Sequence, residues 1–64
     1  MRVLGIDPGT SRIGYGVVDD TPKIVADDYG VVALSRSLPL EKRLYQLHTH
    51  ILNMIHTFDP DAIA

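Results

Sequence analysis

The sequence predicts an α/β fold: a three-stranded antiparallel meander, one helix, and the start of a fourth strand that lies parallel to the first. Two observations predict this order. Three short runs rich in apolar and β-branched residues fill the first half of the chain, and turn-forming residues separate them. The apolar spacing then changes to that of a helix, and a further short apolar run follows. This order is that of an α/β layout, in which we expect one edge of the sheet to be left open.

The length and composition exclude several classes of protein. Sixty-four residues allow one domain, and a chain of this size buries only about 60% of the surface that its unfolded form exposes. The absence of cysteine excludes disulfides and zinc–thiolate sites. No apolar run approaches the roughly 20 residues that span a bilayer. The first residues of the sequence lack the basic region and long apolar stretch of a signal peptide, so we expect a cytoplasmic protein without a membrane partner. The net charge of −2 means that any surface for nucleic acid is local or lies elsewhere.

The first two strands are predicted to form a hairpin. Arg2–Asp7 is an almost continuously apolar run that Pro8-Gly9 terminates, which is typical of a central strand buried on both faces. After the turn, Arg12–Val18 alternates between its two faces. Glycines on one strand face mark a place where another backbone, a packed helix or a ligand comes close. The large residues and the glycines fall on opposite faces: Ile13, Tyr15 and Val17 on one, Gly14 and Gly16 on the other.

A third strand is predicted after a turn at Asp19–Pro22. Lys23–Ala26 resumes with β-branched residues, and Tyr29–Leu34 continues as apolar, strand-like sequence. Between these two runs, Asp27-Asp28 predicts a kink or bulge inside the strand. Ser35-Arg36-Ser37 then ends the pattern. The third strand would complete the antiparallel meander.

The helix is predicted to begin at Leu38-Pro39, where the apolar period changes. We expect it to end near Thr57-Phe58, because Asp59-Pro60 disfavours helical geometry before the proline. Asp61–Ala64 then has the sequence of an opening strand, and the chain stops inside that strand. One apolar stripe follows the helix over about five turns: Leu40, Leu44, Leu47, Ile51, Ile55 and Phe58.

Asp7 is the strongest candidate for chemistry. It stands at the carboxyl end of a predicted central strand, directly before the Pro8-Gly9-Thr10-Ser11 turn, and ligands of α/β sheets gather at that edge. A carboxylate on a rigid strand suits Mg²⁺ or Mn²⁺, because these hard cations prefer oxygen ligands and keep waters that a substrate phosphate can replace. On residue types alone, an aspartate that caps its own turn is the favoured interpretation.

Three histidines, one tyrosine and one arginine have ordinary structural interpretations beside functional ones. His48 and His50 are two positions apart and point to opposite sides of the helix, and His56 lies two turns beyond His48, whereas a metal-binding pair needs the i, i+4 spacing. Tyr15 is interpreted as core or rim packing rather than a base-stacking platform. Arg12 follows the turn and lies near Asp7 if the hairpin is tight, so it could contact a phosphate, although an ordinary strand-end arginine is the slightly favoured interpretation.

The remaining acidic residues are not expected to converge on Asp7. Those after the second strand lie at the opposite end of the hairpin from Asp7, and those at the entry to the fourth strand are also remote from Asp7. The acidic pair inside the third strand is interpreted as a solvated kink, and the last pair as a helix-stop turn. The residues concerned are Asp19, Asp20, Asp27, Asp28, Asp59 and Asp61.

The stretch Leu4-Gly5-Ile6-Asp7-Pro8-Gly9, the Gly14–Val18 strand at this spacing, and Phe58–Ala64 after a leucine-rich helix resemble the start of the RuvC family of Holliday-junction resolvases. The resemblance runs along all 64 residues. It implies a ribonuclease H-like fold, with residues 1–64 as the amino-terminal part of a single nuclease domain. It also implies a homodimeric, divalent-metal-dependent endonuclease that makes paired nicks in four-way DNA and works with a RuvAB-type branch-migration complex.

The resemblance places the first catalytic carboxylate and metal ligand of the family on Asp7. The next catalytic glutamate of the family pattern would fall a residue or two beyond Ala64, and the last acidic residues near the end of a chain more than twice as long. A single aspartate cannot hold the two ions of that chemistry. We therefore expect these 64 residues alone to be inactive.

Three other interpretations are open. Asp7–Ser11 superficially fits the phosphate-binding hairpin of actin-like, Hsp70-like and sugar-kinase ATPases, although Pro8 removes a backbone donor and the Gly14-Tyr15-Gly16 strand favours the resolvases. The YqgF-type putative resolvases share the opening but typically have leucine at the position of Pro8. A non-enzymatic, truncated interaction module, whose open sheet edge a partner covers, also fits the net charge of −2.

Overall fold

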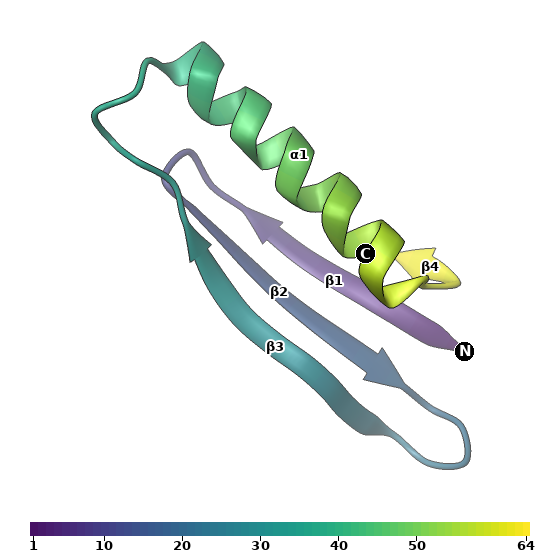
Figure 1. Ribbon diagram of the computed structural model, residues 1–64. Helices are drawn as coiled ribbons and strands as arrows, with labels where there is room; N and C mark the ends of the chain where they lie inside the picture. The colour runs from purple at the N-terminus through teal and green to yellow at the C-terminus, as the bar shows by residue number, and fades with distance from the viewer.

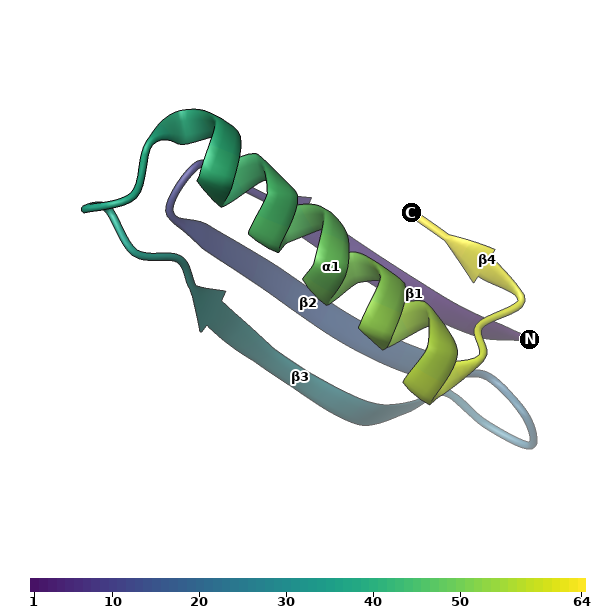
Figure 2. The ribbon, with the colours of Figure 1, turned by 45° about the horizontal axis from the view of Figure 1, so that its top comes forward.

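The computed structural model describes residues 1–64 as a four-stranded sheet with one helix across one face (Figures 1 and 2). The sheet order is β3-β2-β1-β4; the first three strands are antiparallel neighbours, and β4 lies parallel to β1. The predicted fold class is confirmed. The elements are β1 (Arg2–Pro8), β2 (Arg12–Asp19), β3 (Val25–Ala33), α1 (Leu40–Phe58) and β4 (Ala62–Ile63).

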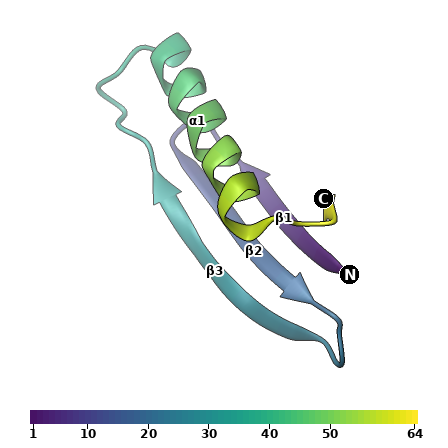
Figure 3. The same ribbon diagram turned by 45° about the vertical axis from the view of Figure 1, so that its right-hand side comes forward.

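The core lies between α1 and one face of the sheet. In β1 and β2, Leu4 pairs with Val17, and residues paired in this way project from the same face. Full burial of each such side chain stabilises the fold by about 1.5–3 kcal/mol. The expectation that β1 is buried on both faces is wrong here, because no element covers the second face (Figure 3). The buried residues are Leu4, Ile13, Val17, Leu34 and Met54.

The predicted irregularity in β3 is confirmed as a bulge. Val17 pairs with Asp28 and Val18 with Ala26, so Asp27 is the extra residue. Asp27 is not merely solvated, however: its Oδ2 accepts a hydrogen bond of 2.6 Å from Nη2 of Arg2, and each side chain is 35% exposed. The bulge therefore turns a carboxylate towards the first residue of β1.

The strand β3 begins later than predicted, at Val25. Lys23 and Ile24 belong to the turn after β2, and the side chain of Ile24 is 79% exposed. The turn is held by the Asp19 carboxylate, whose Oδ1 accepts a 3.0 Å hydrogen bond from the backbone N–H of Thr21. Asp19 keeps its cross-strand partners Arg2 and Val25, so this bond orders the connection directly after β2.

The helix α1 ends at Phe58, as predicted, and begins at Leu40, just after the predicted start at Leu38-Pro39; its apolar stripe is only partly covered. Asp59 takes a left-handed conformation with φ 46°, and its N–H donates to the carbonyl of Ile55, which ends the helix. Met54, outside the predicted stripe, is the buried helix residue. Leu40 and Leu44 are about half exposed. The chain contains no helix with the length and apolar character that crossing a membrane requires.

Candidate functional site

Asp7 projects from the face of the sheet that α1 does not cover. It pairs with Gly14 of β2, so both residues belong to the open face, whereas Leu4 and Val17 belong to the helix face. The surroundings of Asp7 are bare backbone: a Cβ at Gly14 would lie 3.7 Å from Cβ of Asp7, and a Cβ at Gly16 would meet no atom within 4 Å. The carboxylate is exposed.

The turn after Asp7 is set by Gly9. Its N–H donates a 2.7 Å hydrogen bond to the carbonyl oxygen of Arg12, and a Cβ at Gly9 would lie only 2.9 Å from that oxygen. The close approach therefore requires glycine. The turn is satisfied by this backbone bond, and the Asp7 carboxylate takes part in none of the side-chain hydrogen bonds of the chain. The turn-cap interpretation of Asp7 is thus wrong.

Two shallow hollows adjoin Asp7. One, of about 350 Å³, follows the glycine-lined part of the sheet towards Ala64. The other, of about 330 Å³, lies at the end of the hairpin and includes Arg12 and Val31. Both open to solvent on the uncovered face. Asp7 and Gly14 line both hollows.

The strand β4 runs beside β1 towards the site. Ala64 N–H donates to the carbonyl of Leu4, and Ile6 N–H donates to the carbonyl of Ala64, each at 3.0 Å. This pattern sets Ala64 opposite Gly5. No group of three or more histidine, cysteine, aspartate or glutamate side chains is close enough to hold a metal ion, so Asp7 belongs to no such group within these residues.

Tyr15 packs under the helix, as predicted. Its ring centroid is 6.1 Å from that of Phe58, and its hydroxyl donates a 3.3 Å hydrogen bond to Oδ2 of Asp28. The ring lies over Gly30, where a Cβ would come within 3.1 Å of the tyrosine oxygen. Desolvation raises the pKa of Tyr15 above its ordinary value, and the Asp28 carboxylate raises it further.

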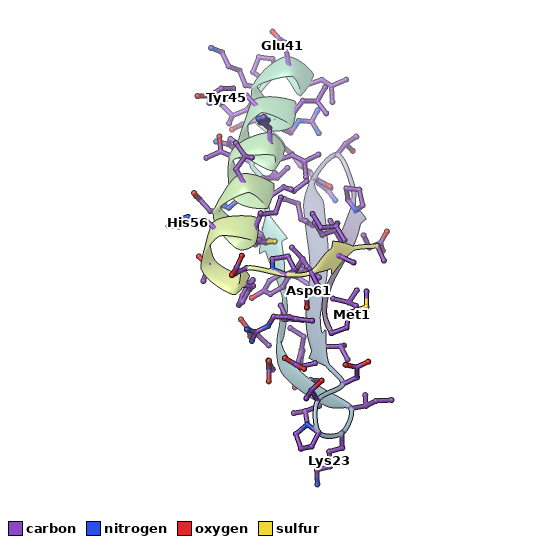
Figure 4. All side chains as sticks on the ribbon, turned by 90° about the vertical axis from the view of Figure 1, so that its right-hand side faces the viewer. Met1, Lys23, Glu41, Tyr45, His56 and Asp61 are labelled. Atoms are coloured by element: carbon purple, nitrogen blue, oxygen red, sulfur yellow. The ribbon has the colours of Figure 1, made fainter.

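The other acidic residues lie away from Asp7, as predicted, and the histidines belong to α1, on the other face of the sheet. Asp20 forms an ion pair with the terminal amine of Met1, which lowers the pKa of the carboxyl and raises the pKa of the amine. Asp61 accepts a 2.8 Å hydrogen bond from the N–H of Arg2 near the start of β4. His56 lies on the exposed side of α1 (Figure 4). None of these groups reaches the open face beside Asp7.

Arg43 is a residue whose part in the site the sequence did not indicate. Its Nη1 donates a 2.9 Å hydrogen bond to the carbonyl of Thr10, and its Nε donates a 3.1 Å bond to the carbonyl of Leu38. The guanidinium therefore joins the first turns of α1 to the turn that follows Asp7. The sequence could not predict this contact. The two residues are 33 positions apart and meet only in the folded chain, and an arginine near a helix start does not by itself indicate its partner.

Comparisons with known proteins agree on one family. The family model described as crossover junction endodeoxyribonuclease RuvC matches residues 3–64. The chain is similar to the RuvC proteins of Thermomicrobium roseum, with 42% identity over 64 residues, and of Fusobacterium nucleatum, with 43% over 65. The whole of this chain is aligned in both comparisons, and it covers 39% and 34% of the lengths of those two proteins.

Solved structures give the same likeness. The Thermus thermophilus RuvC in complex with a Holliday junction substrate matches with a TM-score of 0.86 and 36% identity, over 98% of this chain and 40% of that one. A structure of Thermus thermophilus RuvC gives a TM-score of 0.84 at 34% identity, with the same coverage. The chain thus spans about two fifths of the length of these solved relatives.

Proposed function

The chain belongs to the RuvC family, and from that premise we propose that the whole protein is a crossover junction endodeoxyribonuclease, making paired nicks in four-way DNA during recombination and repair. The observation that carries the proposal is the family match over residues 3–64, together with the exposed carboxylate of Asp7 on the open face of the sheet. The ATPase hairpin and the non-enzymatic module are not favoured, because that match spans nearly the whole chain.

Asp7 is the proposed catalytic carboxylate and metal ligand, with Mg²⁺ or Mn²⁺ as the ion. The residues present fit this role: the carboxylate is exposed, it faces two open hollows, and oxygen is the donor that these hard cations prefer. A bound divalent ion would supply Lewis-acid stabilisation of the phosphate and a more acidic water. The chain itself supplies the orientation of Asp7, through its pairing with Gly14 and the tight turn at Gly9.

The register of β4 supports the placement of a second carboxylate beside Asp7. Ala64 lies opposite Gly5, and side chains two residues apart on a strand share a face. In a strand that continues beyond Ala64, the second further residue would lie opposite Asp7 and on the same face. That is where the family resemblance expects its next glutamate. Residues 1–64 are accordingly proposed to be the amino-terminal part of one nuclease domain.

The proposal extends to the partners that the family resemblance implies. The substrate is four-way junction DNA, the protein acts as a homodimer, and it cooperates with a RuvAB-type branch-migration complex in the cytoplasm. The solved relative bound to a Holliday junction substrate supports the substrate class. Recognition through shape and backbone phosphates fits this substrate, because such contacts position a protein on DNA without reading its sequence.

The test uses the full-length protein and compares Asp7→Asn with Asp59→Asn. Both substitutions replace an exposed carboxylate by an amide, and asparagine suits the left-handed conformation of Asp59. We expect Asp7→Asn to abolish cleavage of a four-way junction with little loss of binding, and Asp59→Asn to cleave as the wild type does. Retained cleavage by Asp7→Asn would refute the assignment of Asp7 as the catalytic carboxylate. A wild-type protein that cuts no branched DNA would overturn the proposed function.

A further inference from the structure

Arg12 occupies the same face of the sheet as Asp7. It is the first residue of β2 and lies two positions before Gly14, the partner of Asp7. Side chains two apart on a strand project from one face, so Arg12 stands about 7 Å further along the strand, at roughly 3.3 Å per residue. The two side chains line one hollow of about 330 Å³, which Pro8, Gly9, Gly14 and Val31 complete.

The backbone that carries Arg12 is anchored on three sides. Its carbonyl accepts the 2.7 Å bond from Gly9, and the carbonyl of Ser11 accepts a 2.8 Å bond from the N–H of Leu34. The carbonyl of Thr10 accepts the 2.9 Å bond from Arg43. The end of the hairpin, which Figure 1 shows beside the start of α1, is therefore tied to itself, to the segment after β3, and to the helix. The backbone position from which the long Arg12 side chain extends is therefore fixed.

The guanidinium of Arg12 is available for an external anion. The ion pairs of the chain join the amine of Met1 to Asp20 and Arg2 to Asp27, so Arg12 and Asp7 face one hollow without pairing. Arg12 is exposed, and its cross-strand neighbour Ala33 offers no polar side chain. The hollow thus presents a cation at one end and a carboxylate at the other.

We infer that Arg12 binds a backbone phosphate of the DNA strand that lies across Asp7. The inference rests on the proposed function for its substrate class. The planar guanidinium donates paired hydrogen bonds to phosphate oxygens, and its distance along the strand from the carboxylate suits a phosphate that neighbours the reacting one. Such a contact holds the strand in place over Asp7 and carries no sequence information. Arg12 is therefore a DNA-positioning residue and not a proton donor.

The test measures the salt dependence of junction binding by full-length Arg12→Gln, with Lys23→Gln as the matched control. Lys23 is an exposed cation at the tip of the β2–β3 turn, at the opposite end of the molecule (Figure 4), so both variants lose one positive charge. Binding is followed with a chelator present, so that no strand is cut. One phosphate contact contributes about 0.9 to the slope of log Kd against log salt.

We expect Arg12→Gln to lower that slope by about 0.9 and to raise Kd about eightfold at 0.1 M salt, the factor that this slope gives relative to 1 M. The loss should be equal for junctions of different sequence, and Arg12→Lys should restore most of the slope. Lys23→Gln should leave the slope unchanged. Because the Arg12 side chain is exposed, the thermal midpoint should match the wild type.

The two proposals fail in distinguishable ways. If the wild-type protein binds and cuts four-way junctions while Arg12→Gln keeps the wild-type slope, the phosphate contact is refuted and the proposed function stands. If the wild-type protein shows no preference for four-way over duplex DNA, both are refuted. A slope loss of the same size in Lys23→Gln would show a bulk charge effect and would also overturn the assignment of Arg12.

Discussion

Arg43 offers a direct test of how the helix holds the turn beside Asp7. Its guanidinium donates to the carbonyls of Thr10 and Leu38, at 2.9 and 3.1 Å. Arg43→Gln removes both bonds, because the shorter amide cannot span the two acceptors. Thr10 is three residues from Asp7 in the turn, so the loss should loosen the support of the carboxylate as well as the fold.

The size of the effect follows from the two bonds. A hydrogen bond from a charged donor contributes about 1.5–3 kcal/mol when it is well shielded. One of these bonds is exposed and the other only partly buried, so water can replace each donor, and we expect a total loss of about 2 kcal/mol. In a protein of 150–250 residues, this lowers the thermal midpoint by about 4–8 °C.

The assay compares full-length Arg43→Gln with Lys42→Gln. Lys42 is an exposed neighbour on the same helix turn and makes none of the side-chain hydrogen bonds of the chain. Thermal unfolding gives the stability, and single-turnover cleavage of a four-way junction gives the activity. We expect Arg43→Gln to lower both and Lys42→Gln to lower neither. Equal midpoints and rates for the two variants would show that Arg43 does not hold the turn after Asp7 against the helix.

Two further predictions concern packing and charge. Gly30→Ala sets a methyl group 3.1 Å from the hydroxyl of Tyr15, so the ring must move, and we expect a loss of about 1–2 kcal/mol in denaturant unfolding; an unchanged midpoint would contradict this packing. The terminal amine of Met1 has a pKa above its ordinary 8.0 because Asp20 accepts its hydrogen bond. Its stabilising effect is complete below pH 8.0 and disappears as the pH rises through the raised pKa. Amine-labelling rates against pH should show this raised pKa in the wild type and a lower pKa in Asp20→Asn, which loses the largest of the causes that raise it.

Features set by neighbouring residues could be predicted from the sequence. Pro60 and the preceding Asp59 predict where α1 ends, and an acidic pair inside an apolar strand predicts the bulge at Asp27. Both depend on local backbone geometry, which proline and strand pairing restrict directly. The position of Asp7 at the carboxyl end of β1 followed from the same local pattern.

Features set by distant residues could not be predicted. The apolar stripe gives the period of the helix but not its rotation against the sheet, so Met54 replaced Leu44 as a buried residue. The partner of Asp27 is Arg2, 25 positions away, and no pattern within either segment indicates that pair. The role of Asp7 in its turn also depended on a contact outside the motif, because the N–H of Gly9 is satisfied by the next strand.

The alternation of side chains in β1 and β2 separates stability from chemistry. Leu4 and Val17 pair under α1, whereas Asp7 and Gly14 pair on the open face. A slip of one residue would bring Asp7 under the helix and Leu4 into solvent. Two free-energy costs oppose such a slip: it would bury an unpaired carboxylate, and it would expose the apolar side chains of the core. The tight turn at Gly9 fixes the same register at the end of the hairpin. The contacts that stabilise the fold therefore also keep the carboxylate exposed on the open face, which is the face where we propose that DNA and a metal ion bind.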